Sequence, residues 1–436
     1  MLFITVDTLR ASNVGAYGYA VGTTPVIDGL AAGGVRFANA VATAPETSPA
    51  TASLLTGHYQ AGTRVRRNGQ RLPDELTTLG ERARAAGWAT GAIVANPLLV
   101  AEYGFDQGFA HFEHVERRGG VTDDRVANAA LAWLEDAATP WFLWLHFMDP
   151  HGPPAADESW SAGFTYPPGA FGDDAPVRVG RALELGVIPG VQALPQHDRL
   201  SQYVRRYDGD VRFTDMQIGR VLDALATAGQ RGRTLVVLVA DHGESLTEHG
   251  ELLQHGWFVY QTTLHVPLVV AWPGRLPAGR VVEARVSGID VAPTLAELAG
   301  MAVAPTEFEG KSLVACLHDA CPPREPVVAL GARDNHPLAL YEAQWKLVQT
   351  PGLVPPTPTE QSLPVHGFPT RERLELYAID RDPGELHDVS AEHPERVAAL
   401  RARLLAVRRR LRSVGADWYP GSSLPVDDGT TAPAPR

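Results

Sequence analysis

An acidic residue and a histidine directly follow one of the most apolar runs in the sequence. Residues 234–240 read Thr-Leu-Val-Val-Leu-Val-Ala, and Asp241 and His242 come next. A buried strand that ends in a carboxylate and an imidazole delivers two metal ligands to the carboxyl edge of a sheet, where open α/β folds place their chemistry. The apolar run 2–6 ends in Asp7 in the same way, so we expect a second acidic side chain at that edge. Each strand by itself is a weak signal, because many strands end in an acid.

A loop rich in Thr, Ser and Pro leads into a second feature that could bind charge. It precedes a helix-forming segment that starts at about Thr47 and stops at Gly57. Free N–H groups and the positive end of the helix dipole favour an anion at such a start. For a lone threonine, an ordinary helix cap is the simpler interpretation.

Strand-like and helical patterns alternate through most of the chain. Apolar runs at 2–6, 89–95, 141–147, 234–240 and 266–272 are separated by helical patterns at 27–32, 76–86, 124–137 and 207–228. This alternation predicts an α/β fold with a large, mostly parallel sheet flanked by helices on both faces. Asp208, Asp210 and Asp215 lie on the last of these helices, where we expect turn-capping or solvated-face roles rather than metal binding.

The pattern of secondary-structure signals changes after about residue 320. Strand-like pieces at 326–330, 338–341, 345–349 and 373–378 precede a helical pattern at 394–412, which predicts a small C-terminal antiparallel sheet with a packing helix. We therefore divide the chain into a catalytic α/β domain at 1–320, a small α+β subdomain at 321–418 and a disordered tail at 419–436. Residues 153–195 are rich in Gly, Pro and Asp and are expected to form an insertion that shapes a substrate site.

Composition excludes several classes of protein. Apolar residues make up 44% and charged residues 20% of the 436 residues, which is typical of a folded globular chain. The net charge of −12 argues against a nucleic-acid partner, because there is no basic excess to neutralise phosphates. No run reaches the roughly 18 apolar residues that an integral membrane span requires.

The ends and the cysteines leave two questions open. Met1 lies almost inside the first expected strand, so an upstream leader is a hypothesis. With such a leader the protein would be periplasmic or secreted, and otherwise cytoplasmic. Cys316 and Cys321 lie close together in the sequence and are expected either to form a local disulfide or to remain free.

Several motifs, taken in order, resemble the sulfatase family of the alkaline phosphatase superfamily. They are Val-Asp-Thr-Leu-Arg at 6–10, Thr-Ser-Pro-Ala-Thr at 47–51, Asp-Pro-His-Gly-Pro at 149–153, Asp-His-Gly-Glu at 241–244, His-Gly-Trp at 255–257 and Leu-Tyr-Ala-Ile-Asp at 376–380. The resemblance covers nearly the whole chain and implies an alkaline phosphatase-like fold. It also implies a divalent metal held by Asp7, Thr47, Asp241 and His242. A hydroxyl beside a dication loses its proton more easily and can attack a tetrahedral sulfur or phosphorus.

The sequence departs from the family pattern at the nucleophile. Sulfatases carry Cys or Ser there, which is oxidised to formylglycine, whereas this chain has Thr47; the motif arginine is replaced by Thr51. Threonine has no route to the aldehyde. It is the nucleophile of the related phosphodiesterases and phosphoethanolamine transferases, so phosphate or phosphonate esters join sulfate esters as expected substrates.

The same resemblance assigns catalytic roles to His151 and His255. They would either bind a second metal or bind the ester oxygens and protonate the leaving group. Zinc, manganese or calcium, as one ion or two, are the expected cofactors. His146 is interpreted as a core histidine. Asp149 would either join a second metal site or orient His151, and we prefer the orienting role.

Two classes of function follow. The first is a metal-dependent hydrolase that cleaves a small anionic ester through Thr47, with a phosphoethanolamine-type transferase as its variant. The second is a non-catalytic binding descendant of the fold. Six polar groups held at one sheet edge favour catalysis, because a fold alone gives no physical reason to bury them together.

Overall fold

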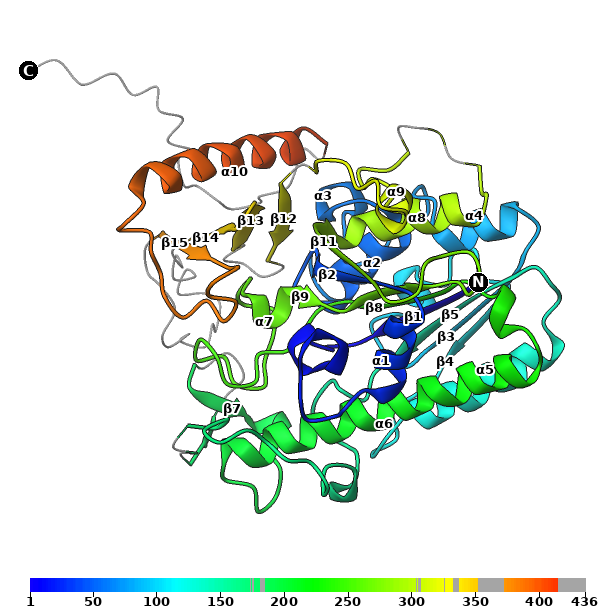
Figure 1. The fold of residues 1–436 in the computed structure, drawn as a ribbon, viewed down its shortest axis with the longest axis horizontal. Helices are drawn as coiled ribbons and strands as arrows, with labels where there is room; N and C mark the ends of the chain where they lie inside the picture. The colour runs from blue at the N-terminus through cyan, green and yellow to red at the C-terminus, as the bar shows by residue number, and fades with distance from the viewer. Residues whose placement is uncertain are drawn as a thin grey trace, which may run out of the picture.

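The computed structural model describes residues 1–172, 174, 176–180, 185–302, 304, 307–324, 326–331, 337–351 and 372–414. In this part of the chain a nine-stranded sheet has the order β11-β2-β10-β8-β1-β5-β3-β4, with β9 paired to β2 (Figure 1). Its strands are β1 Leu2–Val6, β2 Val35–Val41, β3 Ala89–Val94, β4 His111–His114, β5 Trp141–Phe147, β8 Val236–Ala240, β9 His265–Val266, β10 Leu268–Ala271 and β11 Arg280–Ser287.

Helices cover both faces of this sheet. Figure 1 shows α1, α5 and α6 on one face and α2, α4 and α8 on the other. The α-helices are α1 Pro25–Ala32, α2 Thr47–Thr56, α3 Gln60–Thr63, α4 Leu79–Ala85, α5 Asp123–Asp136, α6 Leu200–Thr227, α7 Gln261–Leu264, α8 Val291–Leu298, α9 Val314–Leu317 and α10 Pro394–Val414. The predicted layered α/β architecture is confirmed.

The centre of the sheet consists of β5, β1 and β8. These strands run parallel, with Leu2 paired to both Leu143 and Val236, and every residue in them is buried. Continuous apolar runs suit strands that are covered on both faces, which is why the sequence predicted these three strands well. Pairs of β3 with β4 and β5, and of β2 with β11, are also parallel, so the sheet is mostly parallel as expected.

The part of the sheet formed by β2, β9, β10 and β11 was harder to predict. The run 266–272 is divided into β9 and β10 at Pro267, because proline has no N–H to donate to a neighbouring strand. Strands β2 and β11 were missed, since each interrupts its apolar residues with polar ones such as Arg36 and Glu283. Strand β10 is antiparallel to β8 and β2 and joins the two parts of the sheet.

The aspartates of α6 correct one expectation. The helix begins at Leu200, and Asp208, Asp210 and Asp215 are buried rather than solvated. The backbone N–H groups of Val26 and Ile27, in the first turn of α1, donate to Asp215 at 3.0 and 2.9 Å. A capping role is therefore correct for Asp215, although it caps another helix across the molecule.

The C-terminal part forms the expected small antiparallel sheet. Strands β12 Val327–Leu330, β13 Leu338–Glu342, β14 Trp345–Thr350 and β15 Arg373–Ala378 pair in chain order. Leu400 and Leu404 of α10 belong to the same buried cluster as Leu340, Leu347 and Leu376. The boundary at 320/321 stays a prediction, and residues 419–436 lie outside the described part.

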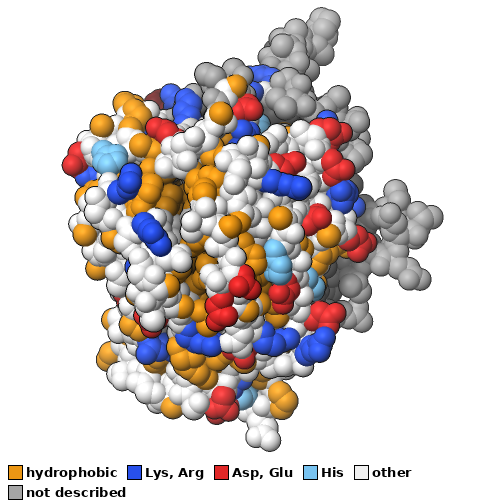
Figure 2. All heavy atoms as spheres, turned by 90° about the vertical axis from the view of Figure 1, so that its right-hand side faces the viewer, with side chains coloured by type: hydrophobic (Ala, Val, Ile, Leu, Met, Phe, Trp, Pro, Cys, Tyr) orange, Lys and Arg blue, Asp and Glu red, His pale blue; other side chains and the backbone are white. Residues whose placement is uncertain are grey.

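The remaining features concern the surface and the insertion. The insertion contains two short parallel strands, β6 Arg178–Gly180 and β7 Val187–Pro189, with β7 beside the start of α6 (Figure 1). Cys316 and Cys321 form a disulfide. Among the helices that are described, none is long and apolar enough to cross a membrane. Acidic and basic side chains are interspersed on the face shown in Figure 2.

Candidate active site

Asp7 and Asp241 leave neighbouring parallel strands at the same edge of the sheet. Val6 of β1 pairs with Ala240 of β8, so the residues that follow them emerge together. Both carboxylates are buried. Burial raises the pKa of Asp241 well above its usual value, and the nearby charge of Asp7 raises it further. Two adjacent buried carboxylates require either a shared proton or a cation.

Each carboxylate has one oxygen that accepts hydrogen bonds and one that has no such partner among the described residues. Asp7 Oδ2 accepts from Asn96 Nδ2 at 2.5 Å, and Asp241 Oδ1 accepts from the N–H groups of His242 at 2.7 Å and Thr8 at 3.3 Å. Thr8 has φ of 55°, a left-handed conformation that β-branched residues rarely adopt. Asp7 Oδ1 and Asp241 Oδ2 therefore retain their lone pairs for a ligand.

His242 completes this group with a third lone pair. Its Nδ1 lies 2.8 Å from the carbonyl oxygen of Gly243, so Nδ1 carries the proton and Nε2 has the lone pair. Nε2 lies 3.7 Å from both Asp7 Oδ1 and Asp241 Oδ2. Burial, reinforced by His255, lowers the pKa of His242 to about 3, so the imidazole is neutral.

Thr47 lies beside His242 but belongs to a different element, helix α2. It is the first residue of α2, as predicted, and its Oγ1 lies 3.3 Å from His242 Nε2. The whole helix is buried, so the positive end of its dipole acts in a poorly solvated place. The next N–H, on Ser48, donates to Asn68 Oδ1 at 2.9 Å and is thereby satisfied.

His146 corrects a second expectation, since it lies at the site rather than in the apolar core alone. Its Nδ1 is 2.7 Å from Thr5 Oγ1, which accepts from Trp144 Nε1 at 2.9 Å. Its Nε2 is 3.5 Å from Asp7 Oδ2. Ligand atoms of Asp7, His146 and Asp241 lie within 4.8 Å of one another, so this buried Asp-His-Asp group could hold a metal ion. No local sequence signal marks this role of His146, because it depends on the register of His146 with Thr5 across two parallel strands.

Two further histidines line the site. The ring centroid of His255 lies 4.6 Å from that of His242 and 5.1 Å from that of His151. His255 Nδ1 is 3.2 Å from both carboxylate oxygens of Glu244. Burial raises the pKa of Glu244 to about 7, although His151 and His242 oppose that shift. The structure thus brings both predicted catalytic histidines together and adds Glu244, whose position in the Asp-His-Gly-Glu motif was its only sequence signal.

Asp149 has a different role from the expected one. Its carboxylate accepts from the backbone N–H groups of Thr122 at 2.8 Å and Asp123 at 2.9 Å, at the start of α5. His151 Nδ1 instead lies 2.8 Å from the carbonyl oxygen of Gly152. Asp149 therefore fixes the turn after β5 and does not orient His151.

The C-terminal sheet supports the segment that carries His255. Glu385 accepts from the backbone N–H of Gln261 at 2.5 Å, and Tyr341 donates to the side chain of Gln261 at 2.7 Å. Lys346 Nζ lies 2.6 Å from Glu385, and both side chains are fully buried. The C-terminal sheet is thus joined to the start of α7, six residues after His255.

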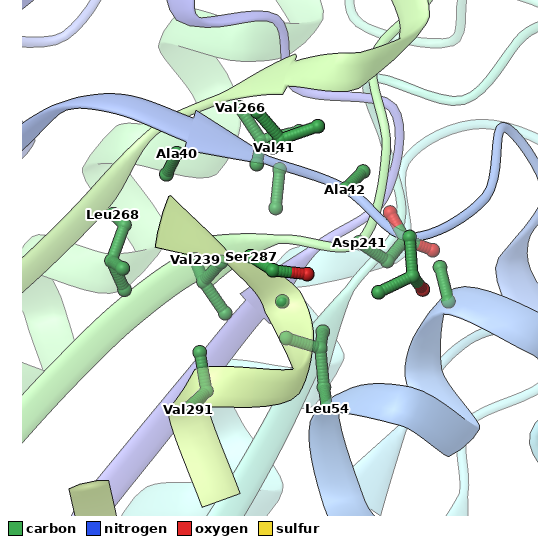
Figure 3. A pocket seen from close by; sticks show the side chains of 14 residues that line it. Ala40, Val41, Ala42, Leu54, Val239, Asp241, Val266, Leu268, Ser287 and Val291 are labelled. Carbon is green, nitrogen blue, oxygen red and sulfur yellow. The ribbon is translucent and has the colours of Figure 1, made fainter. Parts of the chain in front are cut away.

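Behind Asp241 the protein is apolar. A cavity of about 10 Å³ lies there, lined largely by aliphatic side chains of β2, β8 and β10 and by Leu54 and Val291. Figure 3 shows these side chains beside Asp241. Such a volume is at the lower limit for a single water molecule. Thr43 and Ser287 also line the cavity, but most side chains behind the Asp241 carboxylate are apolar, which strengthens electrostatic interactions at the site.

A sequence model of the family described as Sulfatase matches residues 1–301, which is more than half of the chain. The chain belongs to the sulfatase family. A second model, described as N-sulphoglucosamine sulphohydrolase, C-terminal, matches residues 248–410. The expectation of an ester hydrolase is confirmed at the level of the family, and the Asp-His-Asp group agrees with the metal dependence of sulfatases.

Individual sulfatase relatives are distant but extend over most of the chain. A delta 4,5-hexuronate-2-O-sulfatase of Bacteroides thetaiotaomicron is 26% identical over 439 residues, which cover 90% of this chain and 84% of the relative. A phosphonate monoester hydrolase of Agrobacterium radiobacter has a similar fold, with a TM-score of 0.72, 23% identity and coverage of 94% and 95%. A structure solved with its substrate D-glucosamine-2-N,6-O-disulfate has a TM-score of 0.76 at 19% identity, with coverage of 95% and 98%.

Proposed function

We propose that this sulfatase-family protein is a metal-dependent hydrolase that cleaves a sulfate or phosphate/phosphonate ester with Thr47 as the nucleophile. The observation that carries the proposal is the convergence of four polar atoms at one buried point. Thr47 Oγ1 and His242 Nε2 are 3.3 Å apart, and Asp7 Oδ1 and Asp241 Oδ2 each lie 3.7 Å from that nitrogen. Both carboxylate oxygens lack hydrogen-bond partners in the described part of the chain.

These four atoms fit a divalent metal. Orphaned carboxylate oxygens beside a neutral imidazole are a costly arrangement without a cation and a normal one with it. A bound dication would lower the pKa of the Thr47 hydroxyl and attract the anionic oxygens of the ester. One nitrogen among oxygen ligands favours zinc or manganese over calcium.

His146 is better suited to donate a hydrogen bond than to bind the metal. Thr5 Oγ1 accepts from Trp144, and its own hydrogen has two acceptors within reach, His146 Nδ1 at 2.7 Å and the Leu145 carbonyl oxygen at 3.3 Å, of which the histidine nitrogen is the nearer. The His146 proton then resides on Nε2 and points toward Asp7 Oδ2, 3.5 Å away. Asp149 is occupied by backbone N–H groups, so a second metal would lack that carboxylate, and we favour a single ion.

The chain's own groups account for the proton transfers. The deprotonated Thr47 oxygen bonds to sulfur or phosphorus while the bond to the leaving oxygen breaks. The leaving oxygen keeps the bonding pair and takes a proton from the imidazolium of His255, with His151 beside it to bind the anionic oxygens. Water then gives a proton to the same imidazole, its oxygen bonds to sulfur or phosphorus, and the Thr47 oxygen is released.

The test is turnover and metal content measured on the same preparations. Purified protein supplied with zinc, manganese or calcium would be assayed on nitrophenyl sulfate, phosphate monoester, phosphodiester and phosphonate. We expect Thr47→Ala to lower kcat about 10³-fold or more, because the covalent step is lost, while most of the metal remains bound.

Thr51→Ala is the matched control. Thr51 lies one turn along the same helix, is equally buried, and its hydroxyl has no hydrogen-bond partner in the described residues. We expect this variant to keep most of its activity. Substantial activity in Thr47→Ala would reject the covalent mechanism, and a metal-loaded protein inactive on every ester would favour a binding role.

A further inference from the structure

Glu244 is a buried carboxylate with no hydrogen bond to Thr47 or to a proposed metal ligand in the described part of the chain, and the reaction above gives it no role. It is 2% exposed, and both of its oxygens lie 3.2 Å from His255 Nδ1. A nitrogen equally distant from both oxygens of a carboxylate is the geometry of one N–H shared between two acceptors. His255 therefore presents its Nδ1 edge to Glu244.

The backbone builds this pairing. Ser245 and Gln254 form an antiparallel bridge, with N–H to O distances of 3.1 Å and 3.3 Å in the two directions. Glu244 precedes one side of the bridge and His255 follows the other, so the two residues are neighbours across it. The contact is consequently fixed by main-chain pairing and does not depend on a chance side-chain conformation.

We propose that Glu244 is the positioning residue of His255. By holding Nδ1, it sets the plane of the ring and directs Nε2, the opposite nitrogen, toward the leaving oxygen of the ester. The rings of His242 and His151 also pack against this imidazole, with centroids 4.6 Å and 5.1 Å from its own, and limit its rotation. This inference rests on the proposed function, in which His255 supplies a proton to the leaving oxygen.

The arrangement predicts a dependence on the leaving group. A misplaced proton donor harms an ester of a poor leaving group most, because that oxygen needs the proton before it departs. An ester of a good leaving group, such as nitrophenol, departs with little help. A residue that merely stabilised the fold would reduce the two rates by the same factor.

The experiment is kcat/KM for a series of aryl esters, from nitrophenyl to unsubstituted phenyl, of the class that the wild type hydrolyses. We expect Glu244→Ala, which removes the acceptor of the His255 Nδ1–H, to lose about threefold on the nitrophenyl ester and about 10²-fold on the phenyl ester. In a His255→Ala background the same change should add less than twofold, because the two residues act as one unit. Metal content must equal that of the wild type, since Glu244 lies two residues from His242.

Glu248→Ala is the matched control. Glu248 belongs to the same segment but forms an ion pair with Arg10 at 2.7 Å instead of contacting His255. Any loss in this variant should be equal across the ester series. Equal losses in Glu244→Ala, or losses that multiply with those of His255→Ala, would overturn the proposal.

A readout independent of turnover separates this inference from the proposed function. In nitrogen NMR of histidine-labelled protein, the hydrogen-bonded Nδ1–H of His255 should be visible in the wild type and absent in Glu244→Ala. Its persistence in that variant would refute the positioning role. Activity that survives Thr47→Ala would instead refute the nucleophile and leave the measured hydrogen bond standing.

Discussion

Lys346 and Glu385 form an ion pair that couples the C-terminal sheet to the active-site segment. Their charged atoms are 2.6 Å apart, and both side chains are fully buried. Burial lowers the pKa of Lys346 and raises that of Glu385, so the surroundings oppose both charges and each residue depends on the other. Replacing Lys346 by Met keeps an unbranched side chain of similar length and removes only the cation.

The structure sets the size of the effect. With Lys346 gone, the Glu385 carboxylate stays buried without a counterion, which costs about 3–5 kcal/mol of the free energy of unfolding. The Gln261 N–H continues to donate to the same carboxylate and offsets a small part of that cost. Once the pH falls below the raised pKa of Glu385 in the folded variant, each further unit should reduce the cost by about 1.4 kcal/mol, until the carboxyl group of the unfolded chain is protonated as well.

Denaturant unfolding followed by tryptophan fluorescence measures the loss. The double variant Lys346→Met/Glu385→Gln is the control, because its glutamine carries no charge and can still accept from Gln261. We expect the double variant to be within about 1–2 kcal/mol of the wild type, since neutralising both members of a buried pair is often nearly neutral. A single variant within about 1 kcal/mol of the wild type, or a double variant as unstable as the single one, would refute the reasoning.

Three other variants test the interior. Burial raises the pKa of Asp215 to about 6, so the folded protein holds this proton more tightly than the unfolded chain, and stability is gained as the pH falls through 6. Between pH 8 and pH 5 this gain is about 1.4 kcal/mol. Denaturant unfolding at the two pH values should show the gain in the wild type and not in Asp215→Asn. An unchanged pH dependence in the variant would contradict the assignment. Removing the metal with a chelator should lower the Tm of the wild type but barely change that of Asp241→Asn, which has lost a ligand. His146→Gln should keep close to a full complement of metal, and loss of all metal from this variant would show that His146 is a ligand instead of a donor to Asp7.

The parts of this site that the sequence predicted correctly depend on neighbouring residues. The runs 2–6 and 141–147 became strands with those bounds, and α2 began at Thr47. Each depends on a short apolar stretch or on a loop that feeds a helix, signals that persist whatever the rest of the chain does. Because β1 and β8 are parallel neighbours, the acids after them had to meet once the sheet formed.

Contacts between distant residues explain what the sequence alone could not predict. His146 contacts Thr5 across 141 positions, and Asp215 caps a helix 188 and 189 positions earlier. Nothing near either residue distinguishes an ordinary core histidine or a solvated aspartate from these roles. The role of Asp149 likewise depends on a tertiary contact, because its carboxylate accepts from a backbone N–H at the start of α5.

The sequence by itself determined the layered fold, the edge of the sheet that carries the active-site residues and the types of those residues. Only the tertiary structure decided which oxygen or nitrogen of each residue is free and which is engaged. Asp7, Asp241 and His242 present specific lone pairs because Asn96, Thr8 and Gly243 occupy the others. A lone pair is directional, so its availability depends on where every neighbouring donor lies in space, and the order of residues along the chain does not specify that.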